Sequence, residues 1–329
     1  MSEDLNFDMI EHKAENGIHV QKLCGWAGED LARIEFDLIK DTTVNGKKIF
    51  LPFDIQRVKK FGAARRMMLW EIVRQVLGKD TTNYPQEIGD CVSFGAKNAI
   101  EYLMCVEILL KGDAESWRPI FPPYLYGTGR VFVGNDQLRG EDGSLGSWMA
   151  EAVIKYGVLA ADEKDVPGYA GSVAKRWGDS PGPPKEFVEI AKVHPIKSAA
   201  KINSWSELVE AICNGYPCTV ASDQGFSMSP SSDGYHNPEG NWGHQMCIIG
   251  VDDEHSDPFA IILNSWGDVM GKLKDFKTGD PLPAGTIRAR KRVIESMIQQ
   301  GETFAFSNFD GFPGQAQEID DKLFDLIEP

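Results

Sequence analysis

A single cysteine stands between a polar loop and a long apolar segment in the stretch Tyr84-Pro85-Gln86-Glu87-Ile88-Gly89-Asp90-Cys91-Val92-Ser93-Phe94-Gly95. From Cys91 to Leu110, apolar residues occupy nearly every side of a helix, which predicts a central and buried helix. Asp90 or Cys91 falls in its first turn. The free N–H groups and the positive dipole end there favour a thiolate over a thiol. The stretch therefore predicts a cysteine nucleophile at a helix N-terminus.

Two later pieces of sequence are its expected partners, Gly243-His244-Gln245 and Leu263-Asn264-Ser265-Trp266-Gly267. The apolar runs 245–251 and 259–263 flank a turn at 252–258 and predict a hairpin. If the hairpin is symmetric about His255, residue 251 faces 259 and residue 246 faces 264. His244 and Asn264 then lie diagonally on one face of the sheet. A β-bulge would change this parity.

These residue types suit nucleophilic catalysis by a thiol. A cysteine that attacks an amide needs a base, a group that orients the base, and donors for the oxyanion. In that order, the sequence supplies Cys91, His244, Asn264 and Gln86. Taken alone, the cysteine would be a buried small hydrophobe and the histidine a structural one. Their combined setting favours a catalytic site.

The motifs Gln86-x-x-Gly89-x-Cys91-x-x-Phe94, Gly243-His244 and Asn264-Ser265-Trp266-Gly267 together resemble a papain-like cysteine peptidase, of the clan of papain and the cathepsins. The resemblance covers roughly residues 80–310 and is greatest to bacterial or bacteriophage members without a secretory signal or the family disulfides. It implies an α+β fold with two lobes. The left lobe would be α-helical, with its central helix after Cys91, and the right lobe an antiparallel β-barrel-like unit.

The same resemblance implies a role for each motif residue. Cys91 would be the nucleophile, and His244 the base and later the acid. Asn264 would orient the imidazole, and Trp266 would cover that hydrogen bond from water. Gln86 and the backbone N–H of Cys91 would form the oxyanion hole. The substrate backbone would be bound by three further positions, Gly143, Ser144 and Gly243.

The sequence also departs from the family pattern. Ile88 replaces a family cysteine, so the family disulfide there is absent. Asp90 stands beside the nucleophile, where a carboxylate would oppose thiolate formation by like charge. Other differences are Val92, Ser144 and Gln245. These departures leave the substrate class open.

The composition is that of a soluble globular protein, with 329 residues, 42% of them hydrophobic and 25% charged. A formal charge of −15 argues against nucleic-acid partners, because phosphate contacts need a basic face. No apolar run reaches the roughly 18–20 residues of a membrane span, and the N-terminus lacks the pattern of a secretory signal. Six scattered cysteines are expected to be reduced thiols. We expect a cytoplasmic or virion-associated protein.

Three segments are predicted. Residues 1–83 form an N-terminal extension whose role is open between docking, a pro-segment and part of the first lobe. Residues 84–180 form the helical lobe with the nucleophile, and residues 181–329 the β-rich lobe with the His/Asn pair and a C-terminal tail. Helices are expected near 55–77, 147–156, 204–214, 287–299 and 319–327, and strands near 47–52, 217–221 and 303–306, while the apolar residues of 28–40 have mixed spacing.

The function we expect is a thiol hydrolase that cleaves peptide or isopeptide bonds through a Cys91 thioester. One alternative is a non-proteolytic structural or interaction protein, such as a phage virion component; another is a cell-wall peptide hydrolase. The expected partner is a peptide or protein substrate, with assembly into a larger particle in the virion case. No cofactor is expected. No metal site is expected either, because Cys213, Cys218 and His236 lack a zinc spacing.

Overall fold

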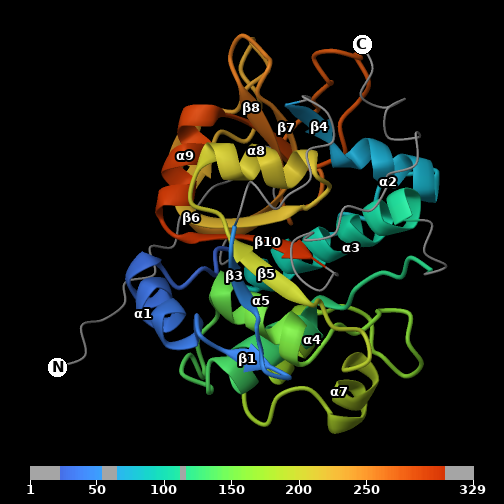
Figure 1. The fold of residues 1–329 in the computed structure, drawn as a ribbon, viewed down its shortest axis with the longest axis vertical. Helices are drawn as coiled ribbons and strands as arrows, with labels where there is room; N and C mark the ends of the chain where they lie inside the picture. Colours follow the sequence, from blue (N-terminus) through green and yellow to red (C-terminus); the bar gives the residue numbers. More distant parts are fainter. Residues whose placement is uncertain (1–22, 54–64, 112–115, 308–329) are drawn as a thin grey trace.

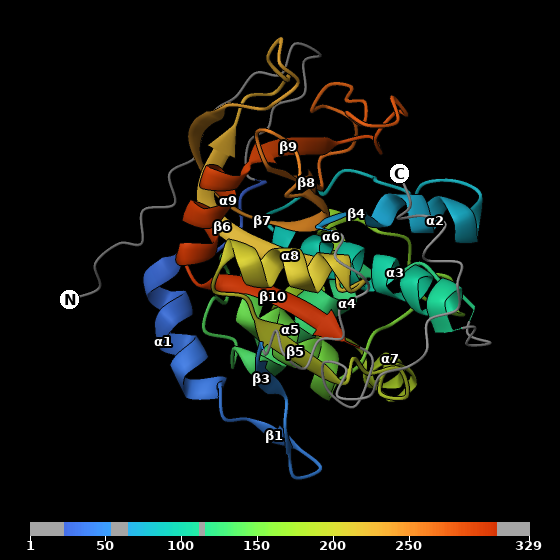
Figure 2. The same ribbon diagram turned by 45° about the horizontal axis from the view of Figure 1, so that its top comes forward.

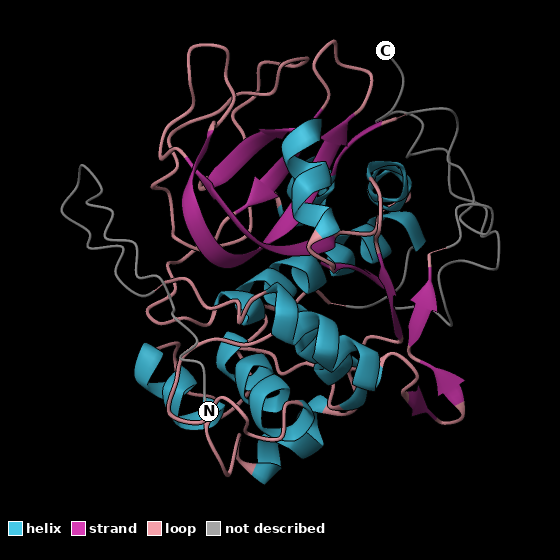
Figure 3. Cartoon of the chain, turned by 90° about the vertical axis from the view of Figure 1, so that its left-hand side faces the viewer, coloured by secondary structure: helices cyan, strands magenta, loops and turns pink. Residues whose placement is uncertain are grey.

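The computed structural model of the chain describes residues 23–53, 65–111 and 116–307. Most helices gather in one half of the molecule and a curved sheet fills the other (Figure 1, Figure 3). This mixed α+β organisation agrees with the expected fold class.

The helices are α1 (Glu29–Ile39), α2 (Leu69–Leu77), α3 (Cys91–Lys111), α4 (Pro122–Gly127), α5 (Gly146–Lys155), α6 (Gly171–Gly178), α7 (Lys185–Ala191), α8 (Trp205–Cys213) and α9 (Lys291–Gln299). A π-helical turn, η1 (Thr128–Val133), follows α4. Helix α8 begins as predicted, because the Ser204 hydroxyl accepts a hydrogen bond from the Glu207 N–H at 3.2 Å. In both ribbon views α8 and α9 lie beside strands of the sheet (Figure 1, Figure 2).

The strands are β1 (Thr43–Val44), β2 (Lys47–Lys48), β3 (Phe50–Pro52), β4 (Arg66–Met68), β5 (Ser198–Lys201), β6 (Cys218–Phe226), β7 (Pro238–Asp252), β8 (Phe259–Leu263), β9 (Thr286–Arg290) and β10 (Glu302–Ser307). The large sheet has the order β3-β5-β10-β6-β7-β8-β9, and β4 adds to β7. All of its pairs are antiparallel except β3 with β5. Among the described strands no pair joins β3 to β9, so the sheet is open and does not close into a barrel.

Helix α3 is the central element that the sequence predicts. It packs against β7 on the sheet side and against α2, α4 and α5 on the helical side. Both kinds of neighbour need an apolar face, which is why the helix is apolar nearly all round. A buried ion pair within it joins Lys97 Nζ to Glu101 Oε2 at 2.8 Å, and the other carboxylate oxygen accepts the Ile120 N–H at 2.9 Å.

At the tip of the β7–β8 hairpin the observed register differs from the predicted one. Residue 259 faces Asp252, and Val251 faces Ala260, one place away from the prediction. A bulge between Ile248 and Gly250 then shifts the pairing back, so that Cys247 faces Leu263. The predicted alignment is therefore correct at the end of the hairpin that carries His244 and Asn264.

Parts of two predicted helices are strands in the structure. Residues 286–290 form strand β9, and only 291–299 are helical, because pairing with β8 overrides the helical periodicity. Arg288 is buried in that strand and donates to the Gly234 carbonyl at 2.9 Å. In the described part of the segment 55–77, residues 66–68 pair with β7 and residues 69–77 are helical. Residues 55–64 and the predicted helix at 319–327 lie outside the described residues.

The first segment contributes to both halves of the molecule. Strand β3 pairs with β5, β4 pairs with β7, and α2 packs on α3. Helix α6 lies in the stretch 168–184, where the sequence predicts the lobe boundary. The ranges 1–83, 84–180 and 181–329 stay a prediction.

Candidate active site

Cys91 is the first residue of α3 and has no exposed surface. Its Sγ accepts a hydrogen bond from the backbone N–H of Gln245 at 3.4 Å. Gln245 directly follows His244, so the thiol lies against β7 within one residue of the imidazole. Burial raises the pKa of the Cys91 thiol, which opposes thiolate formation in this state.

His244 and Asn264 meet at the end of the hairpin. His244 Nε2 and Asn264 Oδ1 are 2.8 Å apart, and the same oxygen accepts the Ser265 N–H at 2.7 Å. A backbone N–H only donates, so this contact identifies the Asn264 atom as oxygen and assigns the imidazole proton to Nε2. Nδ1 then carries the lone pair, and it has no hydrogen-bond partner in the described part of the chain.

The imidazole is held neutral. Burial lowers the pKa of His244 from 6.5 to about 4, while Asn264 and the Leu23 carbonyl act in the opposite direction. A neutral imidazole with its lone pair on Nδ1 has the form that a general base requires.

Two tryptophans enclose this pair. The Trp266 ring centroid lies 4.7 Å from that of His244, and its role in covering the hydrogen bond to Asn264 stays a prediction. Trp242 lies 4.7 Å from Trp266 and 6.5 Å from His244, and the sequence analysis did not identify it. The sequence pattern that could have identified Trp242 is the two-residue period of a strand, because residues 242 and 244 of β7 lie on the same face.

Gln86 is oriented by Ser265. The Gln86 Oε1 atom accepts the Ser265 hydroxyl, and the Gln86 N–H donates to the Ser265 carbonyl at 2.9 Å. The amide nitrogen must therefore point the other way, and it donates to the Leu23 and Ile88 carbonyls, each at 2.8 Å. Ser265 therefore fixes the orientation of the Gln86 side chain. Its place in the motif Asn264-Ser265-Trp266-Gly267 did not predict this contact.

Residues 23–27, which we call the strap, lie across these groups. The Trp26 N–H donates to the Gly243 carbonyl at 2.8 Å. The Ser144 N–H donates to the Gly25 carbonyl at 2.7 Å, and the Ala27 N–H donates to the Ser144 carbonyl at 3.0 Å, so the strap pairs with Ser144 in parallel. Two of the three positions predicted to bind a substrate backbone therefore bind the chain itself.

Glycines make the close approach of the strap possible. A Cβ on Gly25 would stand 1.9 Å from the Gly89 carbonyl oxygen, two residues before Cys91 in the chain. Gly143, the third predicted backbone-binding position, has φ +107°, and a Cβ there would stand 3.0 Å from the Gly25 oxygen. The contact between the strap and the residues it covers therefore requires glycine at position 25 in the strap and at position 143 opposite it.

Asp90 acts on Cys91 in the direction the sequence suggests, because its charge contributes to the raised pKa of the thiol after the larger effect of burial. Its carboxyl is fully buried and accepts the Tyr169 hydroxyl at 3.1 Å. Burial raises the pKa of Asp90 well above its ordinary value, which favours the uncharged acid. For Cys91, burial is the larger cause of the raised pKa and the charge of Asp90 a lesser one.

The histidine and the cysteines that were considered as metal ligands do not form a metal site in the described residues. His236 is buried between the Met270 carbonyl at 2.8 Å and the Arg288 N–H at 3.2 Å. All six cysteines are free thiols. Within the described residues no three His, Cys, Asp or Glu side chains come together as metal ligands, and none of the described helices has the length and apolarity to cross a bilayer.

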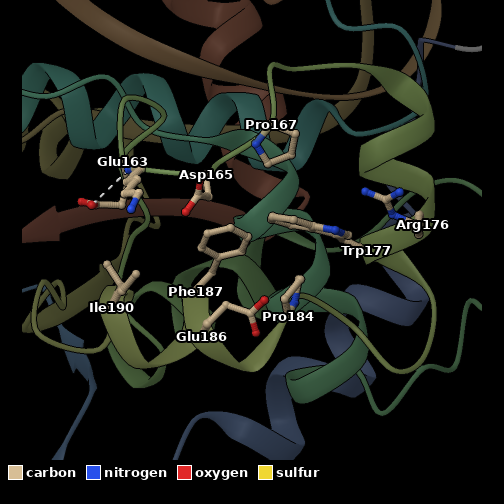
Figure 4. A pocket seen from close by; sticks show the side chains of 10 residues that line it. Glu163, Asp165, Pro167, Arg176, Trp177, Pro184, Glu186, Phe187 and Ile190 are labelled. Carbon is tan, nitrogen blue, oxygen red and sulfur yellow. Dashed lines mark hydrogen bonds between the residues drawn. The ribbon is translucent and has the colours of Figure 1, made fainter.

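An open groove of about 670 Å³ lies elsewhere, around α6 and α7 (Figure 4). The Phe187 ring stands beside the Trp177 indole in its wall, with centroids 5.5 Å apart. None of the residues predicted for catalysis lines this groove.

Comparison of sequences finds no match for the chain, either among protein-family models or among curated proteins. Comparison of structures does. Procathepsin L 3 from the larval midgut of Tenebrio molitor matches with a TM-score of 0.52 at 14% identity, over 84% of this chain and 78% of that one.

Two further structures match in the same range. Xylellain, a cysteine protease from Xylella fastidiosa, has a TM-score of 0.52 at 16% identity, over 82% of this chain and 100% of that one. The proform of Amb a 11, a cysteine protease and ragweed pollen allergen, has a TM-score of 0.53 at 16% identity, over 88% of this chain and 78% of that one. At these identities the likeness concerns the fold.

Proposed function

We propose, on the premise that the chain has the fold of the papain-like cysteine proteases, that it is a thiol hydrolase cleaving peptide or isopeptide bonds. The observation that carries the proposal is the hydrogen bond from His244 Nε2 to Asn264 Oδ1. It leaves the Nδ1 lone pair free, and the Cys91 thiol accepts the backbone N–H of Gln245, the residue that follows His244 in β7.

The proposed reaction has two halves. His244 Nδ1 takes the Cys91 proton, Sγ bonds to the substrate carbonyl carbon, and Gln86 Nε2 and the Cys91 N–H donate to the oxyanion. The carbon–nitrogen bond then breaks, and the imidazolium gives its proton to the leaving amine. Water, deprotonated by His244, attacks the thioester and releases the acid and the Cys91 thiol.

The reaction requires the strap to leave. In the closed state Gln86 Nε2 already donates to the Leu23 carbonyl, and the Gly243 and Ser144 backbones are occupied by Trp26 and Gly25. Departure of the strap admits water, which weakens the burial that raises the pKa of Cys91 and lowers that of His244. We regard the closed state as a latent form.

The test is labelling by a peptidyl epoxide, which traps the thiolates of papain-like peptidases. It uses the full chain with Gly25→Ala, whose added methyl group cannot coexist with the Gly89 carbonyl in the closed state. We expect one adduct, on Cys91, forming faster at neutral pH than with glutathione. Adding His244→Ala should slow labelling by at least about 100-fold, since the base is lost.

Cys91→Ala and Cys247→Ala are the controls, because both thiols are buried at or beside β7. Only the first should abolish the adduct. Labelling no faster than glutathione, or equally fast without His244, would refute the hydrolase.

The alternatives, a structural component of a particle and a cell-wall peptide hydrolase, have no observation of their own in the described residues. Binding of a peptide or protein substrate and a cytoplasmic or virion location belong to the proposal as well.

A further inference from the structure

The loop ahead of α5 is held by a buried arginine. Arg130 lies in the π-helical turn η1, and 2% of its surface is exposed. Its Nε donates to the Gly178 carbonyl, at the end of α6, at 2.8 Å. Its Nη2 donates to the Leu138 carbonyl at 2.6 Å and to the Glu141 carbonyl at 2.7 Å. The guanidinium therefore joins the end of α6 to the loop ahead of α5.

The remaining nitrogen of the guanidinium acts on a single peptide group. Arg130 Nη1 donates to the Gly143 carbonyl. This carbonyl and the Ser144 N–H belong to the same planar peptide, so the two groups point in opposite directions. The Ser144 N–H is the donor that the strap occupies through the Gly25 carbonyl. The contact that Arg130 makes on one side of the peptide therefore sets where the N–H points on the other side.

Gly143 makes such a contact necessary. With φ +107° and no Cβ, its backbone is not confined by side-chain sterics, and the peptide that follows can rotate at low cost. The peptide that precedes Gly143 is fixed by Tyr126, whose hydroxyl accepts the Gly143 N–H at 2.8 Å. The peptide that follows is fixed by Arg130. The positive charge also polarises that peptide, which makes the Ser144 N–H a stronger donor.

We propose that Arg130 is a positioning residue, which directs the Ser144 N–H toward a backbone carbonyl of the bound substrate. The inference rests on the proposed function, because that function gives Ser144 a substrate to pair with. The competing explanation is that Arg130 only stabilises the fold, through the loop carbonyls and through Asp179, whose Oδ1 lies 3.3 Å from Nη2. The two explanations differ in what loss of the guanidinium does to a ligand without a peptide backbone.

The first experiment follows the Ser144 amide in the full chain, where the strap supplies the acceptor. In Arg130→Met the peptide is no longer held, and we expect the Ser144 amide to exchange hydrogen at least about tenfold faster than in the unmodified chain. Arg288→Met is the matched control, because Arg288 is 1% exposed and also donates to backbone carbonyls, those of Gly234 and Lys274. It should change exchange at Ser144 by less than about twofold, since distant sites act independently. Unchanged exchange in Arg130→Met, or an equal change in both variants, would overturn the proposal.

The second experiment separates binding from reaction in the Gly25→Ala chain, whose strap cannot close. It compares a peptidyl epoxide, which has a backbone to pair with Ser144, with iodoacetamide, which has no peptide backbone. For the epoxide, adding Arg130→Met should raise the concentration that gives half-maximal labelling by about tenfold to a hundredfold, the loss expected for one buried hydrogen bond. The maximal rate of labelling by the epoxide and the rate with iodoacetamide should each change by less than about threefold.

Arg130→Lys is a second variant, for use if the buried methionine prevents folding. It keeps the charge, but a single ammonium replaces the fork of three nitrogens and cannot hold both α6 and the Gly143 carbonyl. The epoxide should then bind at least about fivefold more weakly. Equal slowing of both reagents, or unchanged binding of the epoxide, would show that Arg130 only stabilises the fold. If the epoxide labels the Gly25→Ala chain no faster than glutathione, the proposed function fails, while hydrogen exchange at Ser144 still decides the role of Arg130.

Discussion

At the scale of single residues, the closed site keeps both reactive groups uncharged for one reason, which is burial. The Cys91 pKa is raised and the His244 pKa is lowered by the same loss of water. Since the two shifts have a common origin, a change that hydrates the site acts on both groups together.

His244 makes stability depend on pH. Its pKa of about 4 in the folded chain lies below its ordinary 6.5, so between these values the unfolded chain binds a proton that the folded chain does not. Stability therefore falls as the pH drops through this window, by about 1.4 kcal/mol per pH unit for one proton. His244→Gln should lose that part of the slope in urea unfolding measured at pH 7, 6, 5 and 4.5.

The comparison with the variant matters because His236 shifts in the same direction, while Asp90 and Glu302 are shifted upward and act with the opposite sign. Only the difference between the two slopes reports His244. Parallel curves for the two proteins would mean that the imidazole is not held neutral.

At the scale of elements, α3 depends on its internal ion pair. Lys97 and Glu101 are both nearly inaccessible to solvent, so Lys97→Met leaves a buried carboxylate without its cation. We expect a loss of about 3–5 kcal/mol of unfolding free energy, partly recovered by adding Glu101→Gln. Lys192→Met, which breaks an exposed pair with Glu189, should cost less than about 1 kcal/mol.

Denaturant unfolding of the unmodified chain, Lys97→Met, Lys97→Met with Glu101→Gln, and Lys192→Met measures these losses of unfolding free energy. If Lys97→Met and Lys192→Met lose the same small amount, the buried pair does not stabilise α3 and the account of its packing is wrong.

The β7–β8 hairpin shows how far alternation of apolar residues can predict a site. The pattern identifies both strands and brings His244 to Asn264, because every second residue shares a face. It misplaces the pairs near the turn, where Asp252 faces residue 259. A bulge adds one residue without changing the composition of the strand, so only the pairing with β8 reveals it.

The sequence pattern does not predict strand β9, for a related reason. Residues 287–299 contain apolar side chains at spacings that fit a helix throughout, yet 286–290 pair with β8 over their whole length. Contacts made by distant residues outweigh local propensity there.

At the scale of the whole molecule, the strap joins parts that lie far apart in the sequence. It binds Ser144, just ahead of α5, and Gly243 in β7, and it reaches Glu302 at 276 residues from Trp26. No periodicity or motif encodes such contacts, so the sequence leaves the role of residues 1–83 open. The catalytic candidates were accessible to prediction because each one sits in a local motif.

The strap should open in one step when Gly25 gains a methyl group. In Gly25→Ala the contact of 1.9 Å with the Gly89 oxygen excludes the closed position. We expect the Trp26 and Ala27 amides, which donate to Gly243 and Ser144, to exchange hydrogen at least about tenfold faster than in the unmodified chain.

Gly168→Ala is the matched control, because a Cβ there meets nothing within 4 Å. It should leave those two amides unchanged, and amides of β6 should keep their protection in both variants. Unchanged exchange in Gly25→Ala, or equal loss of protection across β6, would show that the strap is not a separable element.

The hydrogen bond from Gln86 to the Leu23 carbonyl has a consequence for how a ligand competes. A ligand carbonyl that binds Gln86 must replace the Leu23 carbonyl as the acceptor. The free energy that it gains is therefore only the difference between two similar hydrogen bonds. Because the strap is tethered to the site, its effective concentration is set by chain geometry, on the order of millimolar for a short flexible link. Dilution of the protein leaves that value unchanged, and the occupancy of the site by its own chain is the same in a crowded solution as in a sparse one.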